Sequence, residues 1–506
     1  MKKPNIMVIL MDDMGFSDPG CYGGEIETPN MDRLAKNGLR YSQFYSTPRC
    51  WPTRSSILTG YYPPQVCMDP IRRDYRASWQ RMIPDHLAPL GYKNYHSGKW
   101  HVFNTRDPEK EGGFDISWGY DIEQFNHFFH TEDGKTQFSS EAITDHALMC
   151  LKEHEQHAPE HPFFHYVCYT TPHFPVQAEQ ADIDKYRDRY LDGWDAMRQR
   201  RYERMKAIGL IDCALSDREP KVPAPHYLAH KEEWDADFGP GEIEHAVAWD
   251  KLTDEQKRFQ ATKMAIHAAM VDRTDREIGR ILDKLESMQV LDDTLIVFLS
   301  DNGCSAEIMI RGQGHDPSAL PGSAFTHLCL GPGWSTCCNT PFRRHKIWAH
   351  EGGVSSPLIV HWPKGIQTQG GIRHDIGHVV DFLPTFIDVA GGDSTNMTLP
   401  EGAPPLPGKS LVPSFTQDGT VQRDHIYHHH QGNRALRVGN WKIVNEGLTD
   451  TGKPEDRWAL YDLSTDRCEM HDLAAENPAL LEKLIAKWQS CEDTYRNPGT
   501  AHNALV

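Results

Sequence analysis

Oxygen-bearing side chains follow two apolar runs of the sequence, residues 6–11 and 295–299. They belong to Asp12, Asp13, Asp301 and Asn302. Ligands of open α/β sheets bind beyond the carboxyl ends of the strands, so two such strands would deliver these oxygens to one edge. Three carboxylates and one amide form a hard oxygen set that suits Ca²⁺ or Mg²⁺ and not zinc. Asp and Asn also begin turns, but the two pairs together favour a metal site.

Lysines and histidines follow further segments, where they could bind an anion or move a proton. They are Lys99 and His101 after segment 92–96, His173 after segment 163–169, and Lys346 in the basic cluster 341–346. The chain has 28 histidines, so a structural or surface role is the ordinary explanation for any single one. For the basic cluster, the corresponding alternative is a solvated charged face.

The segment 50–60 reads Cys-Trp-Pro-Thr-Arg-Ser-Ser-Ile-Leu-Thr-Gly. Pro52 is a natural first-turn residue, which places Cys50 at the entrance to a helix whose free N–H groups stabilise anions. As a bare thiol, Cys50 would be a weak metal partner beside hard oxygen ligands. The segment also lacks the usual surroundings of a cysteine-protease nucleophile.

This segment resembles the signature of the type I sulfatases, Cys-x-[Pro/Ser]-x-Arg followed by a short stretch ending in Leu-Thr-Gly. The resemblance extends along nearly the whole chain. Further matching motifs are residues 12–13 with 15–18, 28–32, 98–101, 113–115, 172–173, 301–303, 339–343 through 351–353, 432–435 and 441–442. The resemblance implies an arylsulfatase-like sulfuric-ester hydrolase of the alkaline-phosphatase-like superfamily.

In that family the signature cysteine is oxidised after synthesis to formylglycine (3-oxoalanine), and the resemblance implies this for Cys50. One hydroxyl of the hydrated aldehyde would attack sulfur, and the second would let the ester collapse and regenerate the aldehyde. The resemblance further implies one Ca²⁺ per chain, with Mg²⁺ as the alternative, and with Asp301 also taking a proton from the attacking hydroxyl. Its implied ligands are Asp12, Asp13, Asp301, Asn302 and the modified Cys50.

The resemblance also assigns catalytic and substrate-binding roles to the basic residues. Arg54 would stabilise the formylglycine and metal cluster, and Lys99 and Lys346 would clamp the sulfate. His173, together with Lys346, would protonate the leaving oxygen. His101 would remove the proton of the second hydroxyl and so release sulfate.

The implied partners are a sulfate monoester, from an aryl sulfate or a sulfated carbohydrate, and a maturation enzyme. The maturation enzyme would be a formylglycine-generating or an anaerobic sulfatase-maturing enzyme. Two alternatives stay open: a phosphodiesterase or phosphonate monoester hydrolase of the same superfamily, and a non-catalytic binder of sulfated ligands. We expect loops such as 123–134 and 218–248 to set substrate specificity, with Trp51 as a wall of the pocket.

The elements that must position these residues are short apolar runs that alternate with helical periodicity. This pattern predicts an α/β fold with a parallel sheet covered by helices on both faces. The resemblance implies the alkaline-phosphatase-like form of this fold, in which the sheet is large, mixed and mostly parallel. The clearest predicted strands are 6–11, 163–169, 295–299 and 358–361, and a long helix is predicted between 256 and 288. Thr28 and Pro29 predict the start of another helix.

A Gly- and Pro-rich stretch, 391–413, marks a boundary between two predicted domains, 1–398 and 399–506. We expect the second to be a small antiparallel sheet, with strands near 435–438, 441–444 and 458–461, and one packed helix beginning at Pro478. The histidines at 425 and 428–430 are expected to edge the substrate opening or lie in solvent, with a transition-metal site as the alternative.

Composition narrows the possible functions and compartments. The 506 residues carry a formal charge of −18, which argues against a nucleic-acid partner. Twelve cysteines are too sparse for a disulfide framework, and no apolar run is long enough for a membrane span. Because no signal peptide is visible, we expect a cytoplasmic protein, or a periplasmic or secreted one if a signal was removed.

Overall fold

The computed structural model describes residues 3–73, 75–120, 126–130, 136–222, 241–308, 315–447 and 457–496. Most of the predicted specificity loop 123–134 lies outside the described residues, as do residues 223–240 of the second predicted loop, 218–248. The residues predicted to carry the chemistry all lie inside them.

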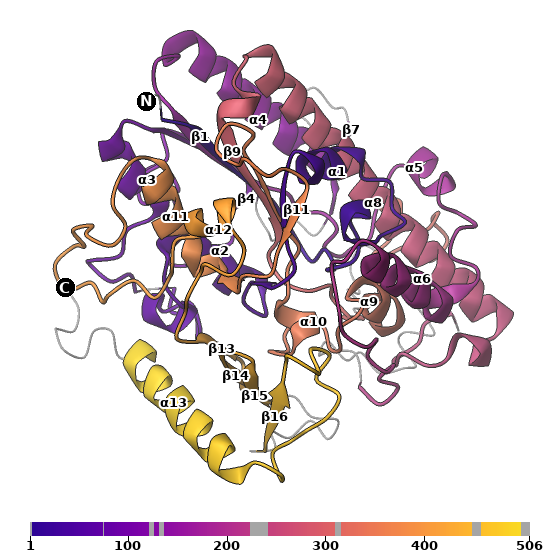
Figure 1. Cartoon of the computed structure of the whole chain (residues 1–506). Coiled ribbons are helices and arrows are strands. Elements are labelled where there is room, and N and C mark those ends of the chain that lie inside the picture. Colours follow the sequence, from indigo (N-terminus) through magenta and orange to yellow (C-terminus); the bar gives the residue numbers. More distant parts are fainter. Residues whose placement is uncertain are drawn as a thin grey trace.

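The centre of the molecule is a mixed eight-stranded sheet (Figure 1). In spatial order its strands are β11 (Gly371–Arg373), β2 (Gly38–Tyr41), β10 (Leu358–His361), β9 (Thr294–Ser300), β1 (Asn5–Met11), β8 (Phe163–Cys168), β4 (Lys93–Lys99) and β5 (Ile116–Tyr120). Only β10 runs antiparallel to its neighbours, β9 and β2. The predicted mostly parallel sheet is therefore confirmed.

Helices cover both faces of this sheet, as predicted (Figure 1). Alternate side chains of β1 point to opposite faces, so Met7 and Ile9 join one hydrophobic core and Val8 and Leu10 join the other. The first core includes α1 (Pro29–Lys36), α4 (Ser139–His157) and α8 (Asp254–Ser287), and the second includes α2 (Cys50–Thr59), α3 (Ile83–Leu87) and α11 (Phe382–Val389). Strands buried on both faces explain the continuous apolar runs of the sequence.

The two helices whose starts were predicted, α1 and α8, each begin after a threonine at the N-cap position. Pro29 occupies the first turn of α1 behind Thr28. At the start of α8, the Gln256 amide donates to the Thr253 hydroxyl at 3.2 Å, and the Thr253 amide donates to the Gln256 side chain at 3.0 Å. This capping box begins the helix two residues before the predicted start.

Shorter elements complete the larger part of the chain. Two small sheets pair β3 (Phe44–Tyr45) with β12 (Gly377–His378), and β6 (Phe128–His130) with β7 (Thr136–Phe138). The remaining α-helices of the described residues in this part are α5 (Gln180–Asp184), α6 (Gly193–Ala207), α9 (Pro332–Cys338), α10 (Glu351–Val354) and α12 (Val412–Thr416).

The C-terminal part forms a separate antiparallel sheet with one packed helix, as predicted (Figure 1). Its elements are β13 (Ile426–His430), β14 (Asn433–Val438), β15 (Trp441–Asn445), β16 (Trp458–Asp462) and α13 (Pro478–Arg496). Trp488 of α13 packs on this sheet in a common core with Leu436 and Ile443.

The histidine tract forms most of β13, a strand that the sequence analysis did not predict. His428 and His430 are only 3% and 1% exposed, so of the two expected places, the substrate opening or solvent, solvent is wrong for these two residues. Strand alternation turns both toward the interior, where His430 contacts Trp51 and Asp69.

Within the described residues, no helix has the length and apolar character needed to cross a membrane.

Candidate functional site

The predicted oxygen set converges at the carboxyl ends of β1 and β9. These strands are parallel neighbours with Met11 opposite Ser300, so the residues that follow them meet at one edge of the sheet. The Asp13 amide donates to Asp301 Oδ1 at 3.2 Å, and Asn302 Nδ2 donates to Asp13 Oδ1 at 2.7 Å. All four side chains, including that of Asp12, are at most 2% exposed.

Two oxygens of this set are buried without a hydrogen-bond partner among the described residues: Asp12 Oδ1 and Asn302 Oδ1. Leaving a buried acceptor unpaired is costly unless something else binds it. One ligand atom each of Asp12, Cys50 and Asp301 also lies within 4.8 Å of the others. The residues therefore fit a hard divalent cation, which carboxylate and amide oxygens bind well.

Cys50 is the first residue of α2 and is only 2% exposed. The preceding turn is held by Thr53, whose hydroxyl accepts from the Thr47 amide at 3.0 Å and whose own amide donates to the Arg49 carbonyl at 3.2 Å. Burial raises the pKa of the Cys50 thiol, with the lysines Lys99 and Lys346 opposing the shift. The unmodified side chain is therefore a neutral thiol at neutral pH, which is a poor nucleophile.

Three buried cations face three of the buried carboxylates. Arg54 donates to Asp301 at 2.8 Å, Lys99 to Asp12 at 2.5 Å and Lys346 to Asp13 at 2.8 Å. Arg54 also donates to the Lys99 carbonyl oxygen at 2.9 Å, which ties α2 to the end of β4. The formal charges of these six groups cancel, so a divalent cation leaves the site positive and suited to an anionic substrate.

The carboxylates titrate differently because their surroundings differ. Burial acts to raise the pKa of Asp12, but the charges of Lys99, His173 and Arg54 bring it below its ordinary value. Burial and the neighbouring Asp12 raise the pKa of Asp301 to about 7. Two carboxylates this close tend to share one proton. A cation bound between them would favour the ionised form of both.

His173 and His101 both lie beside this cluster and are both neutral at neutral pH. Burial and Lys346 lower the pKa of His173 to about 4, and burial and Lys99 lower that of His101 well below its ordinary value. His173 Nδ1 lies 2.7 Å from the Phe174 carbonyl oxygen, to which it donates. The neutral ring therefore presents an unprotonated Nε2, which lies 3.7 Å from Asp13 Oδ2.

Two charged residues of the site, Glu307 and Arg49, were not predicted from the sequence. The Glu307 carboxylate lies 3.4 Å from Lys346 Nζ and 3.5 Å from the Arg49 guanidinium, and it accepts from the Ser305 hydroxyl at 2.8 Å. Burial opposes ionisation, but Lys346 and Arg49 lower the pKa of Glu307 to about 2. Glu307 follows Asp301 by six residues in no recognised motif, so no sequence signal pointed to it.

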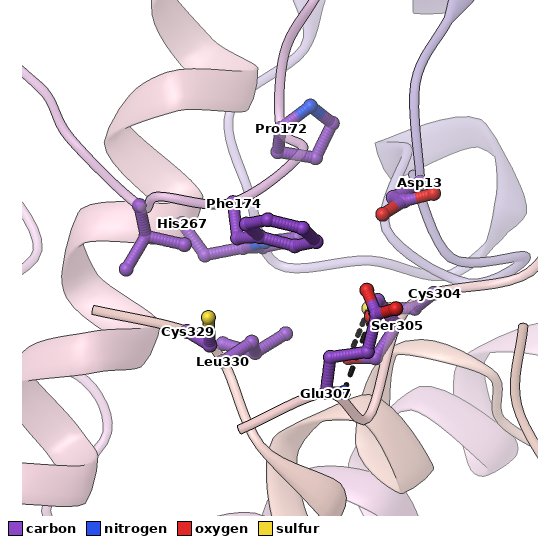
Figure 2. A pocket seen from close by; sticks show the side chains of 10 residues that line it. Asp13, Pro172, Phe174, His267, Cys304, Ser305, Glu307, Cys329 and Leu330 are labelled. Carbon is purple, nitrogen blue, oxygen red and sulfur yellow. Dashed lines mark hydrogen bonds between the residues drawn. The ribbon is translucent and has the colours of Figure 1, made fainter. Parts of the chain in front are cut away.

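Figure 2 shows a cavity beside Asp13 that is lined by Phe174, Ser305 and Glu307, among other residues. The cavity measures about 10 Å³, which is room for one water molecule. Lys346 Nζ lies 5.5 Å from the centre of the Phe174 ring, so the ring also borders the cation cluster. The cavity next to Asp13 is thus lined both by apolar side chains, such as Phe174, and by charged side chains, such as Glu307.

Trp51, next to Cys50, lies at the outer side of the cluster. Its ring centre is 5.6 Å from that of His101 and 5.3 Å from that of His430. The guanidinium of Arg49 lies 4.9 Å from the same ring. The C-terminal sheet therefore reaches, through His430, the residue that follows Cys50.

Comparisons with known proteins agree over nearly the whole chain. The model of the family described as Sulfatase matches residues 4–392, and that of the N-sulphoglucosamine sulphohydrolase C-terminal region matches residues 343–490. An uncharacterized sulfatase of Schizosaccharomyces pombe is 31% identical over 96% of this chain and 93% of its own length. An arylsulfatase of Klebsiella aerogenes is 28% identical over 81% and 91%.

A solved structure shares the fold. The crystal structure of Ps i-CgsB in complex with k-i-k-neocarrahexaose has a TM-score of 0.66 at 23% identity and covers 98% of this chain and 94% of that one. The match includes both the large sheet and the C-terminal sheet, because it spans almost all of both chains.

Proposed function

The chain belongs to the sulfatase family and is a sulfuric-ester hydrolase, and from this premise we propose that it works through formylglycine at position 50 and a bound Ca²⁺. One observation carries the proposal. A buried cysteine at the start of a helix lies beside Asp12 and Asp301, with one ligand atom of each within 4.8 Å. A neutral thiol has no evident use there, whereas a hydrated aldehyde is an oxygen nucleophile beside a cation site.

Formylglycine fits the position for a chemical reason. A single hydroxyl at position 50 could attack sulfur, but the sulfate ester it formed would be stable. The second hydroxyl of the hydrate allows that ester to break down without attack by water at sulfur. The proposal requires a maturation partner, which is a formylglycine-generating or an anaerobic sulfatase-maturing enzyme acting on Cys50.

The proposed cation ligands are Asp12, Asp13, Asp301, Asn302 and the modified residue at position 50. Oxygen ligands of this kind favour Ca²⁺, which accepts more ligands and looser geometry than Mg²⁺. When bound, the ion would neutralise charge on a sulfate oxygen and on the nucleophile. The unpaired oxygens of Asp12 and Asn302 support this assignment.

The chain's own cations bind and orient the sulfate. Lys99 is held by Asp12 and Lys346 by Asp13, and both lysines are buried. A tetrahedral anion between them gains two charge-assisted hydrogen bonds in a site from which water is largely excluded. Arg54 holds the Asp301 carboxylate, the group that takes the proton of the attacking hydroxyl.

The two histidines serve different proton transfers. His101 is neutral, and its Nδ1 is buried without a partner among the described residues, so the ring has a free position to accept the proton of the second hydroxyl. His173 is also neutral in the free enzyme. A bound sulfate ester places negative charge beside its Nε2, which favours the protonated ring that donates to the leaving oxygen together with Lys346.

The substrate is a sulfate monoester of an aryl alcohol or of a carbohydrate. An aromatic side chain, Trp51, borders the nucleophile and offers a flat surface to a ring of either kind.

The first experiment is the mass of the tryptic peptide from Cys50 to Arg54, taken from protein made beside a formylglycine-generating enzyme. Loss of the sulfur and appearance of an aldehyde is the expected result. An intact thiol under these conditions would refute the proposed nucleophile and favour a binder of sulfated ligands.

A second experiment compares turnover of an aryl sulfate with that of an aryl phosphodiester and an aryl phosphonate monoester. We expect the sulfate to be turned over fastest, with the Cys50→Ala variant as the inactive control. Faster turnover of either phosphorus ester would favour the alternative superfamily activity instead.

A further inference from the structure

Two cysteines far apart in the sequence lie side by side outside the catalytic cluster. Cys213 follows α6, and Cys468 follows β16, 255 residues later. Their sulfur atoms are 3.9 Å apart, although all twelve cysteines of the chain are free thiols in this structure. A disulfide bond measures about 2.05 Å, so the two sulfurs must approach by roughly 2 Å to form one.

The surroundings allow that approach. Cys213 lies in a segment without regular secondary structure, flanked by the exposed residues Asp212 and Ala214. Cys468 lies in the connection between β16 and α13, also outside any helix or strand. Side chains in such segments can change rotamer without breaking a helical or sheet hydrogen-bond ladder.

The two thiols differ in a way that suits successive steps of thiol exchange. Cys213 is partly exposed, whereas Cys468 is buried, with its sulfur 3.0 Å from the Ala214 carbonyl oxygen and 3.3 Å from that of Pro341. The hydrogen bond with Cys468 lowers the pKa of the Cys213 thiol; burial opposes this shift, and the charge of Arg467 adds to it. Cys213 is therefore the thiol that a soluble oxidant can reach, and Cys468 is placed to resolve the product.

The location gives the pair a structural consequence. Cys468 directly follows Arg467, whose guanidinium hydrogen-bonds Glu351 at 3.3 Å and lies 4.5 Å from the ring centre of Phe342. A disulfide bond between Cys213 and Cys468 would join the segment after α6 to the connection between β16 and α13. That connection contacts Pro341, five residues before Lys346.

We propose that Cys213 and Cys468 are a redox-controlled cross-link between the catalytic part of the chain and its C-terminal sheet. The thiolate of Cys213 attacks a small-molecule disulfide such as oxidised glutathione, forming a mixed disulfide and releasing one thiol. The thiolate of Cys468 then displaces the second thiol, so two protons and two electrons pass from the protein to the reagent and one S–S bond forms.

Other cysteines provide an internal comparison. Cys304 and Cys338 are also in contact, but both are buried at 2% exposure or less, so a soluble disulfide has no access to them. Cys21 is partly exposed, as Cys213 is. Oxidation is therefore expected to select the 213–468 pair because it combines access with a neighbouring thiol.

The test treats the full-length protein with oxidised glutathione, blocks the remaining thiols, and digests it with trypsin without reduction. The expected product links the peptides 207–218 and 468–483 and is lighter by two hydrogens than the two together. Reduction should separate them. The Cys21→Ser variant should give the same product, and the Cys213→Ser variant should not.

The oxidised wild-type protein should also unfold about 4 °C above the reduced protein, because the cross-link closes a very long loop in the unfolded chain. This increase should be absent in Cys213→Ser. A stable glutathione adduct on Cys213 without the linked peptide, or no modification of Cys213, would overturn the proposal. A linked product without a rise in the unfolding temperature would overturn its structural consequence.

Discussion

At the scale of single residues, the proposed mechanism requires two hydroxyl groups at position 50 for turnover. Cys50 is buried beside Asp12, Asp301 and the two lysines, so a hydroxyl placed there meets the same neighbours. What a serine lacks is the second hydroxyl that allows the ester to collapse. A serine at position 50 would therefore allow the attack on sulfur but not the release of sulfate.

We predict that Cys50→Ser becomes sulfated at position 50 when it is given an aryl sulfate, and that the ester persists. Intact-protein mass spectrometry should show the addition of one sulfo group, and steady-state turnover should be absent. Cys50→Ala, which has no hydroxyl, should gain no mass. Continued turnover by Cys50→Ser would contradict the need for a second hydroxyl.

Glu307 is a buried carboxylate that contacts two cations of the site. Its carboxylate lies between Lys346 and Arg49, and it is almost fully buried. We predict that Glu307→Gln lowers kcat/KM for an aryl sulfate by about 10- to 100-fold, because Lys346 loses one of its two anionic partners. Steady-state kinetics would measure this, with the exposed-site variant Glu286→Gln unchanged. Wild-type kinetics in Glu307→Gln would remove Glu307 from the site.

The metal site can be tested without an activity assay. We predict that a chelator lowers the unfolding temperature and that added Ca²⁺ restores it, because an ion bound only by the folded state stabilises that state by mass action. Asp301→Asn should lose this response, and the exposed-site variant Asp292→Asn should keep it. Full restoration by Mg²⁺ at lower concentration than Ca²⁺ would contradict the choice of Ca²⁺.

At the scale of elements, the site depends on how closely β9 approaches α10. Gly303, directly after Asn302, donates its amide to the Gly353 carbonyl at 3.0 Å. A Cβ atom at position 303 would lie 1.8 Å from the Gly352 carbonyl oxygen. Any larger residue must therefore push the end of β9 away from α10.

We predict that Gly303→Ala lowers the free energy of unfolding by about 2–4 kcal/mol and also reduces turnover, because the displacement moves Asn302. Urea unfolding and steady-state kinetics measure the two effects. Gly119→Ala is the matched control, since a Cβ there has no neighbour closer than 3.9 Å. Equal stability of the two variants would show that β9 and α10 can separate without cost.

At the scale of the whole molecule, a buried ion pair joins the C-terminal sheet to helix α10 of the larger part of the chain. Lys442 of β15 lies 2.9 Å from Glu351 at the start of α10 and 2.8 Å from Glu469. All three side chains are at most 1% exposed. Removing the shared cation leaves two buried carboxylates with fewer partners, which is costly in a medium of low dielectric.

We predict that Lys442→Met destabilises the protein by about 3–5 kcal/mol, measured by urea unfolding. The exposed-site variant Lys409→Met should change stability by less than about 0.5 kcal/mol. A neutral effect of Lys442→Met would show that the methionine side chain packs well enough to offset the lost ion pairs.

Much of the fold could be predicted because its signals are local. The strands β1, β8 and β9 are mostly apolar and are buried at every position, since strands in the middle of this sheet are buried on both faces. The direction of β10 could not be predicted, because strand direction depends on the path of the connection. β13 was missed because three consecutive histidines hide the alternation of buried and exposed positions.

The sequence by itself determined the types and order of the reacting groups: the cysteine in its signature, the strand-end oxygens, the lysines and the histidines. Only the tertiary structure decided what they touch. Three such contacts join residues that are 39 to 379 positions apart: Glu307 with Lys346, Trp51 with His430, and Cys213 with Cys468. Such contacts arise from chain packing, and packing distances leave no periodic or compositional trace in the sequence.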